Sequence, residues 1–239
     1  MAAPGRLVQV YDMSEPIPPS DLFKEQLLNS LRCAHPRIST IRVPKHNRVY
    51  SADDENKMIY IIESGQIKLA ALSREGRECL LGIRIVGDLF GESCLSGLGT
   101  RLETATAMEN SILKRVPCET FLKYLSSDTL LLNGFLQYLA ERIAEQQQVV
   151  VDLMTINSEY RLGKALLQLG DKLGKKYPSS IRIEHRISHE ELSQIVGTTR
   201  PRISEFMQKF RALGLIETSA EHFLIIKKNR LADYLARVT

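Results

Sequence analysis

The side chains best suited to one specific chemistry lie in a polar segment near the C-terminus, between Ile187 and Phe210. Arginine can donate two hydrogen bonds to guanine O6 and N7, while glutamine and glutamate can address the edges of adenine and cytosine. These residue types gather on one face of a predicted helix, and the residues that we expect to read bases are Arg200, Arg202, Ser204, Glu205 and Gln208. Their spacing indicates sequence-specific contact in a groove of DNA.

Two short helices with a turn between them must position these side chains. Ser188 followed by Glu191 predicts a capping box at the start of the first helix, and Gly197 predicts its end. Thr199 is expected to cap the second helix, because Pro201 then falls in the first turn, where its missing N–H costs nothing. Apolar residues share the opposite face of the second helix at helical spacing: Ile203, Phe206, Met207 and Phe210. This pattern is typical of a helix-turn-helix; a helical hairpin whose polar face meets only solvent is the alternative.

The excess of positive over negative charge is confined to the last third of the chain. Residues 161–239 hold 15 Lys and Arg against 8 Asp and Glu, whereas residues 1–160 hold 17 against 20. Such an asymmetry is expected when one domain faces a polyanion. Strands at 215–218 and 223–227 would form a wing behind the two helices, followed by a helix at 231–238. The side chains that we expect to contact phosphates are Arg161, Lys164, Thr199, Lys209, Lys227 and Lys228.

The composition is that of an ordinary globular protein, with 239 residues, 44% of them hydrophobic and 25% charged. No apolar run approaches the roughly 20 residues of a membrane helix. The four cysteines, at 33, 79, 94 and 118, form no C-x-x-C pair, so we expect a reducing cytoplasm and no membrane partner. Because the sequence offers no nucleophile-base pair, phosphate loop or metal-ligand spacing, we expect no catalytic residue, no metal and no enzymatic activity.

The part before residue 119 is predicted to be mainly β structure. An irregular, proline-rich arm covers residues 1–20, and apolar spacing predicts a short helix at 22–31. Short β-branched runs separated by glycines then predict a sandwich or a small antiparallel barrel. Strands are expected at 41–43, 58–63, 66–72, 79–85 and 111–116, with hairpin turns at 63–66 and 74–77.

A long helix is predicted from Glu119 to Asn157, a stretch with no proline and one glycine. Its a and d spacing predicts a dimer seam, in which a polar Gln146 would fix the register. Packing of the helix on its own domain would give a similar stripe and is the alternative. The expected seam residues are Leu132, Leu136, Leu139, Ile143, Gln146, Val150 and Leu153. A helix at 161–173 and a strand at 181–183 should follow.

From about residue 20 to the end, the chain resembles the Crp-Fnr family of bacterial transcription regulators. The most specific matching segments are Gly87-Asp88-Leu89-Phe90-Gly91-Glu92, Arg161-Leu162 and Val196-Gly197-Thr198-Thr199-Arg200. The resemblance implies an α+β fold with an antiparallel β-roll sensor domain (21–118), a long dimerisation helix (119–158) and a winged helix-turn-helix domain (159–239). It also implies a homodimer on a near-palindromic operator, with RNA polymerase as a further partner. Pro201 and Glu205 replace residues that are typically Glu and Arg in the two namesake regulators, so we expect a different operator.

The effector site departs further from the family pattern. In members that bind cyclic nucleotides, a Gly-Glu pair holds the ribose and an Arg-Ser/Thr-Ala triplet holds the phosphate. Gly91 and Glu92 match, but Arg101 is followed by Leu102 and Glu103, whose carboxylate would oppose a bound anion. The expected effector pocket comprises Gly91, Glu92, Arg101, Gln146 and Gln147. Because the phosphate motif is incomplete, the effector stays open, and Gly91 and Glu92 alternatively serve only a turn of the roll.

Other sensing chemistry has weaker support in the sequence. An iron-sulfur cluster of the fumarate-nitrate type needs several cysteines near the N-terminus, where only Cys33 lies. Cys94 directly follows the Gly-Glu turn; it could report oxidation or simply act as a small buried apolar residue. The alternative function is a ligand-binding regulatory module of the cyclic-nucleotide type that acts through protein contacts.

Overall fold

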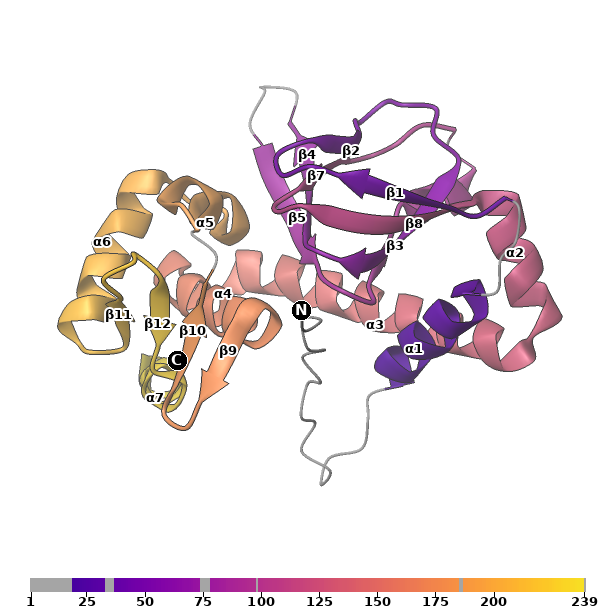
Figure 1. Cartoon of the computed structure of the whole chain (residues 1–239). Helices are drawn as coiled ribbons and strands as arrows, with labels where there is room; N and C mark the ends of the chain where they lie inside the picture. Colours follow the sequence, from indigo (N-terminus) through magenta and orange to yellow (C-terminus); the bar gives the residue numbers. More distant parts are fainter. Residues whose placement is uncertain (1–18, 33–36, 74–77, 98, 185–186, 239) are drawn as a thin grey trace, which may run out of the picture.

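A computed structural model describes residues 19–32, 37–73, 78–97, 99–184 and 187–238. The predicted arm, the turn at 74–77 and Cys33 therefore lie outside the described residues, apart from the first residues of helix α1 (Pro19–Arg32). Figure 1 shows a β-rich domain and a smaller C-terminal domain, with a long helix running beneath the first and leading into the second.

The N-terminal domain is a roll of two antiparallel four-stranded sheets, with strand orders β1-β8-β3-β6 and β2-β7-β4-β5. The strands are β1 (Ser39–Val43), β2 (Arg48–Tyr50), β3 (Met58–Ser64), β4 (Ile67–Leu72), β5 (Glu78–Arg84), β6 (Leu89–Phe90), β7 (Thr104–Ala107) and β8 (Ser111–Pro117). The five predicted strands are confirmed, while the short strands β2, β6 and β7 were not predicted. Side chains from both sheets meet in an apolar core that includes Tyr50, Tyr60, Ile62, Ile67 and Phe90.

The predicted hairpin at 63–66 is wrong, because β3 and β4 belong to different sheets. The turn instead carries the chain from one sheet to the other. Gly65 has a φ of +94°, and a Cβ there would lie 2.2 Å from the hydroxyl oxygen of Ser111. Glycine permits both the backbone conformation and the close approach. By contrast, β4 and β5 do pair, with Leu72 opposite Glu78 across the 74–77 segment.

The single helix predicted from Glu119 to Asn157 is also wrong, because the chain forms two helices, α2 (Cys118–Ser127) and α3 (Thr129–Thr155). Asp128 lies between them in an extended conformation. Its Oδ1 accepts hydrogen bonds from the backbone N–H groups of Leu130 and Leu131, at 2.9 and 3.2 Å. An aspartate in this position ends one helix by capping the next.

Two different faces of α3 carry apolar side chains. Leu131, Phe135 and Tyr138 are buried against α1 and α2. A second stripe faces outward: the exposed fractions of Leu136, Ile143 and Val150 are 55%, 56% and 56%. Packing within the protomer therefore accounts for the first stripe and leaves most of the second one uncovered.

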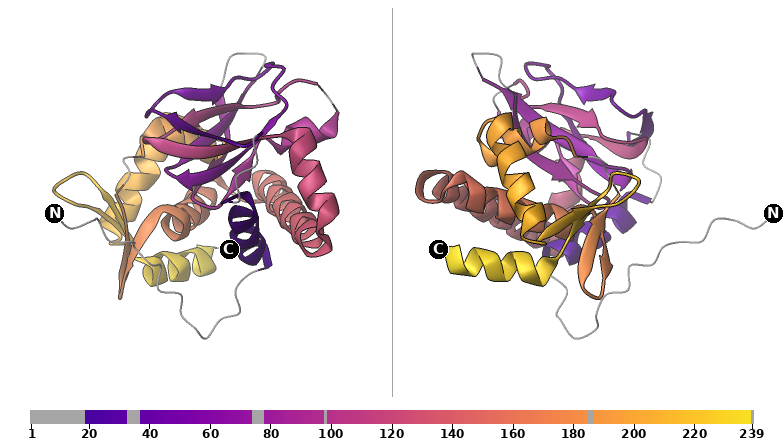
Figure 2. Two further views of the ribbon diagram at one scale, coloured as in Figure 1. Left: turned by 45° about the vertical axis from the view of Figure 1, so that its right-hand side comes forward. Right: turned by 90° about the vertical axis from the view of Figure 1, so that its left-hand side faces the viewer.

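The C-terminal domain contains a helix-turn-helix and a four-stranded antiparallel sheet of order β11-β12-β10-β9. Its elements are α4 (Ser158–Leu173), β9 (Gly174–Tyr177), β10 (Ser180–Ile183), α5 (His189–Val196), α6 (Arg200–Ala212), β11 (Ile216–Thr218), β12 (Leu224–Ile226) and α7 (Lys228–Val238). The predicted wing is confirmed as the β11-β12 pair, whereas β9 was not predicted. The figures show α5 on the side of this domain that adjoins the roll (Figures 1 and 2), and in Figure 1 α6 lies on the side of α5 away from the roll.

The two domains meet where α5 packs against β5. Leu80 and Ile83 of the roll share an apolar cluster with Leu192 of α5. Beside this contact is a cavity of ≈ 360 Å³, lined by cationic side chains of the roll such as Lys45 and Lys68 and by carboxylates of the C-terminal domain such as Glu191. The position of the helix-turn-helix is thus fixed by the roll as well as by α3.

Candidate DNA interface and effector site

The start of α5 has the capping box that the sequence predicts. The backbone N–H of Glu191 donates to the hydroxyl of Ser188 at 3.1 Å, and the Glu191 carboxylate accepts from the Ser188 N–H at 2.8 Å. Gly197 follows α5 with a φ of +66°, which an L side chain adopts only with strain. These local contacts set the angle at which α6 leaves the turn.

The exposed face of α6 carries four of the five residues predicted to read bases. Arg200, Arg202, Glu205 and Gln208 are exposed, while Ile203, Met207 and Phe210 are buried on the other face. Among the described residues, none of these four side chains has a hydrogen-bond or ion-pair partner. The face is thus free to donate to and accept from a nucleic acid.

Ser204, the fifth of these residues, is engaged within the protein. Its hydroxyl donates to the Arg200 carbonyl at 3.2 Å and lies 2.8 Å from His189 Nδ1 on α5. Burial, followed by the charges of Arg211 and Arg200, lowers the pKa of His189. Ser204 and a neutral His189 therefore join the two helices of the motif.

Thr199 occupies the N-cap position of α6, as predicted, and Pro201 lies in the first turn. However, the Thr199 side chain makes no capping hydrogen bond in the described structure. Its exposed hydroxyl is available at the end of the helix where backbone N–H groups point outward, a position suited to an anionic oxygen.

Arg161 has a structural role that its sequence position did not reveal. Its Nε donates to the Val196 carbonyl at 2.9 Å and its NH2 group to the Gly197 carbonyl at 3.3 Å. The remaining terminal nitrogen donates to the carbonyl of Ile156, at the junction of α3 and α4. One guanidinium thus ties the end of the long helix to the helix-turn-helix, with little capacity left for a phosphate.

The predicted phosphate-contacting lysines all form ion pairs within the chain. Lys164 pairs with Asp152 of α3, whose side chain is 12% exposed. In each of the other three pairs at least one side chain is exposed: Lys209 with Glu159, Lys227 with Glu217, and Lys228 with Asp171. Exposed pairs contribute only about 0–1 kcal/mol, so a phosphate can displace these carboxylates at small cost.

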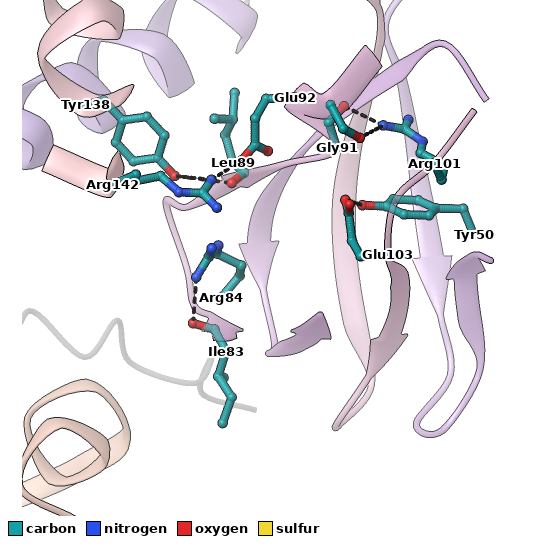
Figure 3. Close-up of polar contacts among 11 residues, drawn as sticks. Tyr50, Ile83, Arg84, Leu89, Gly91, Glu92, Arg101, Glu103, Tyr138 and Arg142 are labelled. Atoms are coloured by element: carbon teal, nitrogen blue, oxygen red, sulfur yellow. Dashed lines mark hydrogen bonds and ion pairs between the residues drawn. The ribbon is translucent and has the colours of Figure 1, made fainter. Parts of the chain in front are cut away.

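Arg101, predicted to bind an effector phosphate, is buried in the roll with 1% of its surface exposed. One terminal nitrogen donates to the backbone carbonyl of Gly91 (Figure 3). The other donates to the carbonyl of Met58 and, at 3.1 Å, to Asn56 Oδ1. The guanidinium carbon lies 4.3 Å from the centre of the Tyr50 ring. Arg101 therefore acts as a brace between two strand ends, with its terminal N–H groups directed at backbone oxygens.

Glu103 also points into the roll. Its carboxylate accepts a 2.7 Å hydrogen bond from the Tyr50 hydroxyl, as Figure 3 shows. Burial, followed by the charge of Glu103, raises the pKa of Tyr50. The Tyr60 and Phe90 rings stack beside Tyr50, with their centroids 5.1 Å apart. Aromatic rings and this carboxylate thus occupy the space next to Arg101.

Glu92, predicted to hold a ribose, forms an ion pair with Arg142 of α3 instead. Glu92 begins a short 3₁₀ helix, η1 (Glu92–Ser96). Burial works against the Arg142 cation, but Glu92, Tyr138 and Asp88 together outweigh burial and raise the pKa of Arg142. Tyr138, one turn earlier, donates to the Leu89 carbonyl at 3.2 Å. The same region therefore connects the roll to the long helix (Figure 3).

Arg142 was not predicted as a functional residue, although the sequence carries a signal for it. It lies four residues after Tyr138, in register with Leu131 and Phe135 on the face of α3 that packs inward. The structure brings Gly91, Glu92 and Arg101 together as predicted. In contrast, Gln146 and Gln147 lie further along α3 and are exposed.

No group of three or more potential metal ligands occurs among the described residues. Over the same part of the chain, no helix is long and apolar enough to cross a membrane.

Comparisons with known proteins agree with this arrangement. Residues 40–128 match the model of the cyclic nucleotide-binding domain, and residues 160–234 match that of the Crp-like helix-turn-helix domain. The CRP-like cAMP-activated global transcriptional regulator of Mycobacterium tuberculosis is 24% identical over 92% of this chain and 98% of its own length. The fumarate and nitrate reduction regulatory protein of Escherichia coli K12 is 24% identical over 80% of this chain and 76% of that protein. The structure of a CooA mutant from Carboxydothermus hydrogenoformans, 21% identical, superposes with a TM-score of 0.71 over 87% of this chain and 95% of that one.

Proposed function

This chain belongs to the Crp-Fnr family of transcription regulators, and we propose that it works as a homodimer whose two α6 helices read a near-palindromic operator. The observation that carries the proposal is the free polar face of α6, with Arg200, Arg202, Glu205 and Gln208 exposed and uncommitted. An apolar opposite face holds the helix on its domain. A helix presented in this way can lie in the major groove with its polar side chains against base edges.

Phosphate contacts would supply much of the affinity and set the register of the protein on DNA. Lys209, Lys227 and Lys228 are well placed to supply them, because their surface ion pairs are weakly held. The Thr199 hydroxyl is suited to a phosphate near the start of α6. Arg161 and Lys164 would contribute indirectly, by fixing the domain to α3.

The second apolar stripe of α3 supports a dimer along this helix. Leu132, Leu136, Ile143, Val150 and Leu153 are all exposed in the protomer, and large apolar patches on a protein surface mark interaction sites. Their a and d spacing suits a two-stranded seam, in which a symmetry-related copy would cover the same residues. Leu139 is partly covered by the protomer's own apolar cluster and would lie at the edge of this seam.

We further propose that operator binding does not depend on cyclic AMP. Arg101 uses its terminal N–H groups on carbonyls and on Asn56, Glu92 is paired with Arg142, and Tyr50 and Glu103 fill the adjoining space. A cyclic phosphate would have to displace these contacts and face the carboxylate of Glu103. A transcription regulator of this kind would act in the cytoplasm and would contact RNA polymerase at its promoters.

The test is a selection of bound sequences from random DNA by the purified protein, at fixed salt, with and without cyclic AMP. We expect the same palindromic motif from both arms. A motif recovered only with the nucleotide would show that Gly91, Glu92 and Arg101 still form a working pocket. If no motif is recovered, and if retention of the protein on DNA does not fall as the salt concentration rises, a module that acts through protein contacts is favoured instead.

A further inference from the structure

Two cysteines that are distant in the sequence lie together beside the Glu92–Arg142 ion pair. Cys94 lies in η1, two residues after Glu92, and Cys118 is the first residue of α2. Both are free, and both are partly exposed. The thiol of Cys118 donates a 3.9 Å hydrogen bond to the carbonyl oxygen of Cys94.

Backbone contacts hold both residues in this relationship. The Cys94 N–H donates to the Gly91 carbonyl at 3.3 Å, and the Cys118 N–H donates to the Lys57 carbonyl at 3.0 Å. Cys94 also packs against the apolar cluster that contains Phe121 of α2. The two cysteines are thus held in place by the packed junction between the roll and the helices.

We propose that Cys94 and Cys118 form a modification site, at which a small peroxide converts the two thiols into an intrachain disulfide. In the first step a cysteine thiolate attacks the O–O bond, giving a sulfenic acid and releasing water or an alcohol from the peroxide. In the second step the other sulfur attacks the sulfenic sulfur, the S–S bond forms, and water leaves. Two thiols are oxidised and one peroxide is reduced.

The environment indicates which sulfur reacts first. Burial and the neighbouring Cys118 thiol raise the pKa of Cys94 to about 12, so Cys94 is almost entirely protonated near neutral pH. Cys94 also packs against the apolar cluster, whereas Cys118 is not part of it, so we assign the first attack on the peroxide to Cys118 and the resolving step to Cys94. This order gives the two cysteines distinguishable behaviour when each is replaced.

A disulfide here would fix η1 to the start of α2. The same five-residue η1 carries Glu92, which pairs with Arg142, and Ser93, whose hydroxyl lies 3.4 Å from a terminal nitrogen of Arg101. Oxidation therefore acts on the element that contacts both of these arginines. It would also cross-link a 25-residue loop, which stabilises a folded chain by restricting the unfolded one.

The experiment treats the reduced, full-length protein with hydrogen peroxide, blocks the remaining thiols by alkylation, and maps the peptides by mass spectrometry. We expect one cross-linked peptide that joins Cys94 to Cys118 and disappears after dithiothreitol, together with a melting temperature that rises by a few degrees. Cys79→Ser is the matched control and should leave the cross-link intact, since Cys79 is exposed on β5.

Two single variants test the order of the steps. Cys94→Ser should accumulate a sulfenic acid at Cys118 that dimedone traps, whereas Cys118→Ser should leave Cys94 largely unlabelled. Labelling of Cys94 alone would overturn this order. If both cysteines still react with the alkylating agent after peroxide treatment, the proposed disulfide site would be refuted. Because these measurements require no DNA, their outcome is independent of the proposed operator binding.

Discussion

Glu92 of η1 and Arg142 of α3 form an ion pair that joins the roll to the helix carrying the proposed dimer seam. Their side chains are only 22% and 14% exposed, so neither charge is fully solvated. Arg142 precedes Ile143, an exposed residue of that seam, along the same helical turn. The pair therefore connects a turn of the roll to the surface on which a second protomer would lie.

Removing either partner of this ion pair alone should lower the free energy of unfolding more than removing both partners together. We expect Arg142→Met or Glu92→Gln alone to lower the free energy of unfolding by about 2 kcal/mol, because each leaves a partly buried charge without its partner. The double variant should lose less than the sum of the two single losses. Chemical denaturation of the four proteins gives the coupling energy, and strictly additive losses would refute an energetic role for the pair.

Arg101 should behave as a structural residue. Arg101→Met should lower the free energy of unfolding by about 3 kcal/mol, because the carbonyls of Gly91 and Met58 lose their hydrogen bonds from the guanidinium and Gly91 keeps only the longer one from the Cys94 N–H. Arg101→Lys should rescue little, since a single ammonium cannot reproduce the planar fork that reaches both carbonyls. Thermal unfolding monitored by circular dichroism measures both effects. A lysine variant as stable as the parent would contradict the bracing role.

The sequence predictions were accurate where a feature depends on contacts between residues close together in the chain. Ser188, Glu191 and Gly197 fix the ends of α5 through contacts within a few residues, and the sequence alone predicted them. The break between α2 and α3 at Asp128 is equally local. An aspartate two residues before a run of leucines is a signal for a helix start, but it was missed because no proline marks the break.

The parts that were not predicted depend on distant partners. Strands β2 and β6 have three and two residues, too few to show a periodic pattern, and they exist only through pairing with β7 and β3. The bracing role of Arg101 depends on Met58, 43 positions away in the chain. Likewise, Arg161 contacts Val196 across 35 positions. No local pattern of residue types specifies such contacts.

Arg200 is expected to read one base in each half-site. Arg200→Ala should weaken operator binding by roughly 1–3 kcal/mol and relax the preference at a single position, because a bidentate contact to guanine would be lost. Lys123→Ala, on the exposed surface of α2, is the matched control for the loss of one positive charge. Binding to a library of single-base operator variants measures both. A uniform loss on all sequences would instead assign Arg200 to the phosphates.

His189 should make the helix-turn-helix sensitive to acid. Its pKa is lowered in the folded protein from the ordinary value of 6.5, by burial and by the charges of Arg211 and Arg200. The folded state therefore binds fewer protons than the unfolded state, and stability should fall as the pH drops below 6.5 towards the folded-state pKa. Melting temperatures between pH 8 and pH 5 test this, and His189→Gln should flatten the acid limb. Parallel curves of melting temperature against pH for the parent and the His189→Gln variant would rule out this role of His189.

The exposed stripe of α3 should be required for both association and operator binding. Ile143→Asp and Val150→Asp place a carboxylate at positions that are each 56% exposed in the protomer, so the fold should tolerate them, whereas a paired seam should not. Leu122→Asp, at a 48% exposed position on α2, is the matched control and should remain a dimer. Sedimentation equilibrium measures the association, and operator affinity should fall at least tenfold in the two seam variants because one protomer reaches only one half-site. A dimer that survives both substitutions would move the interface to another face of the molecule.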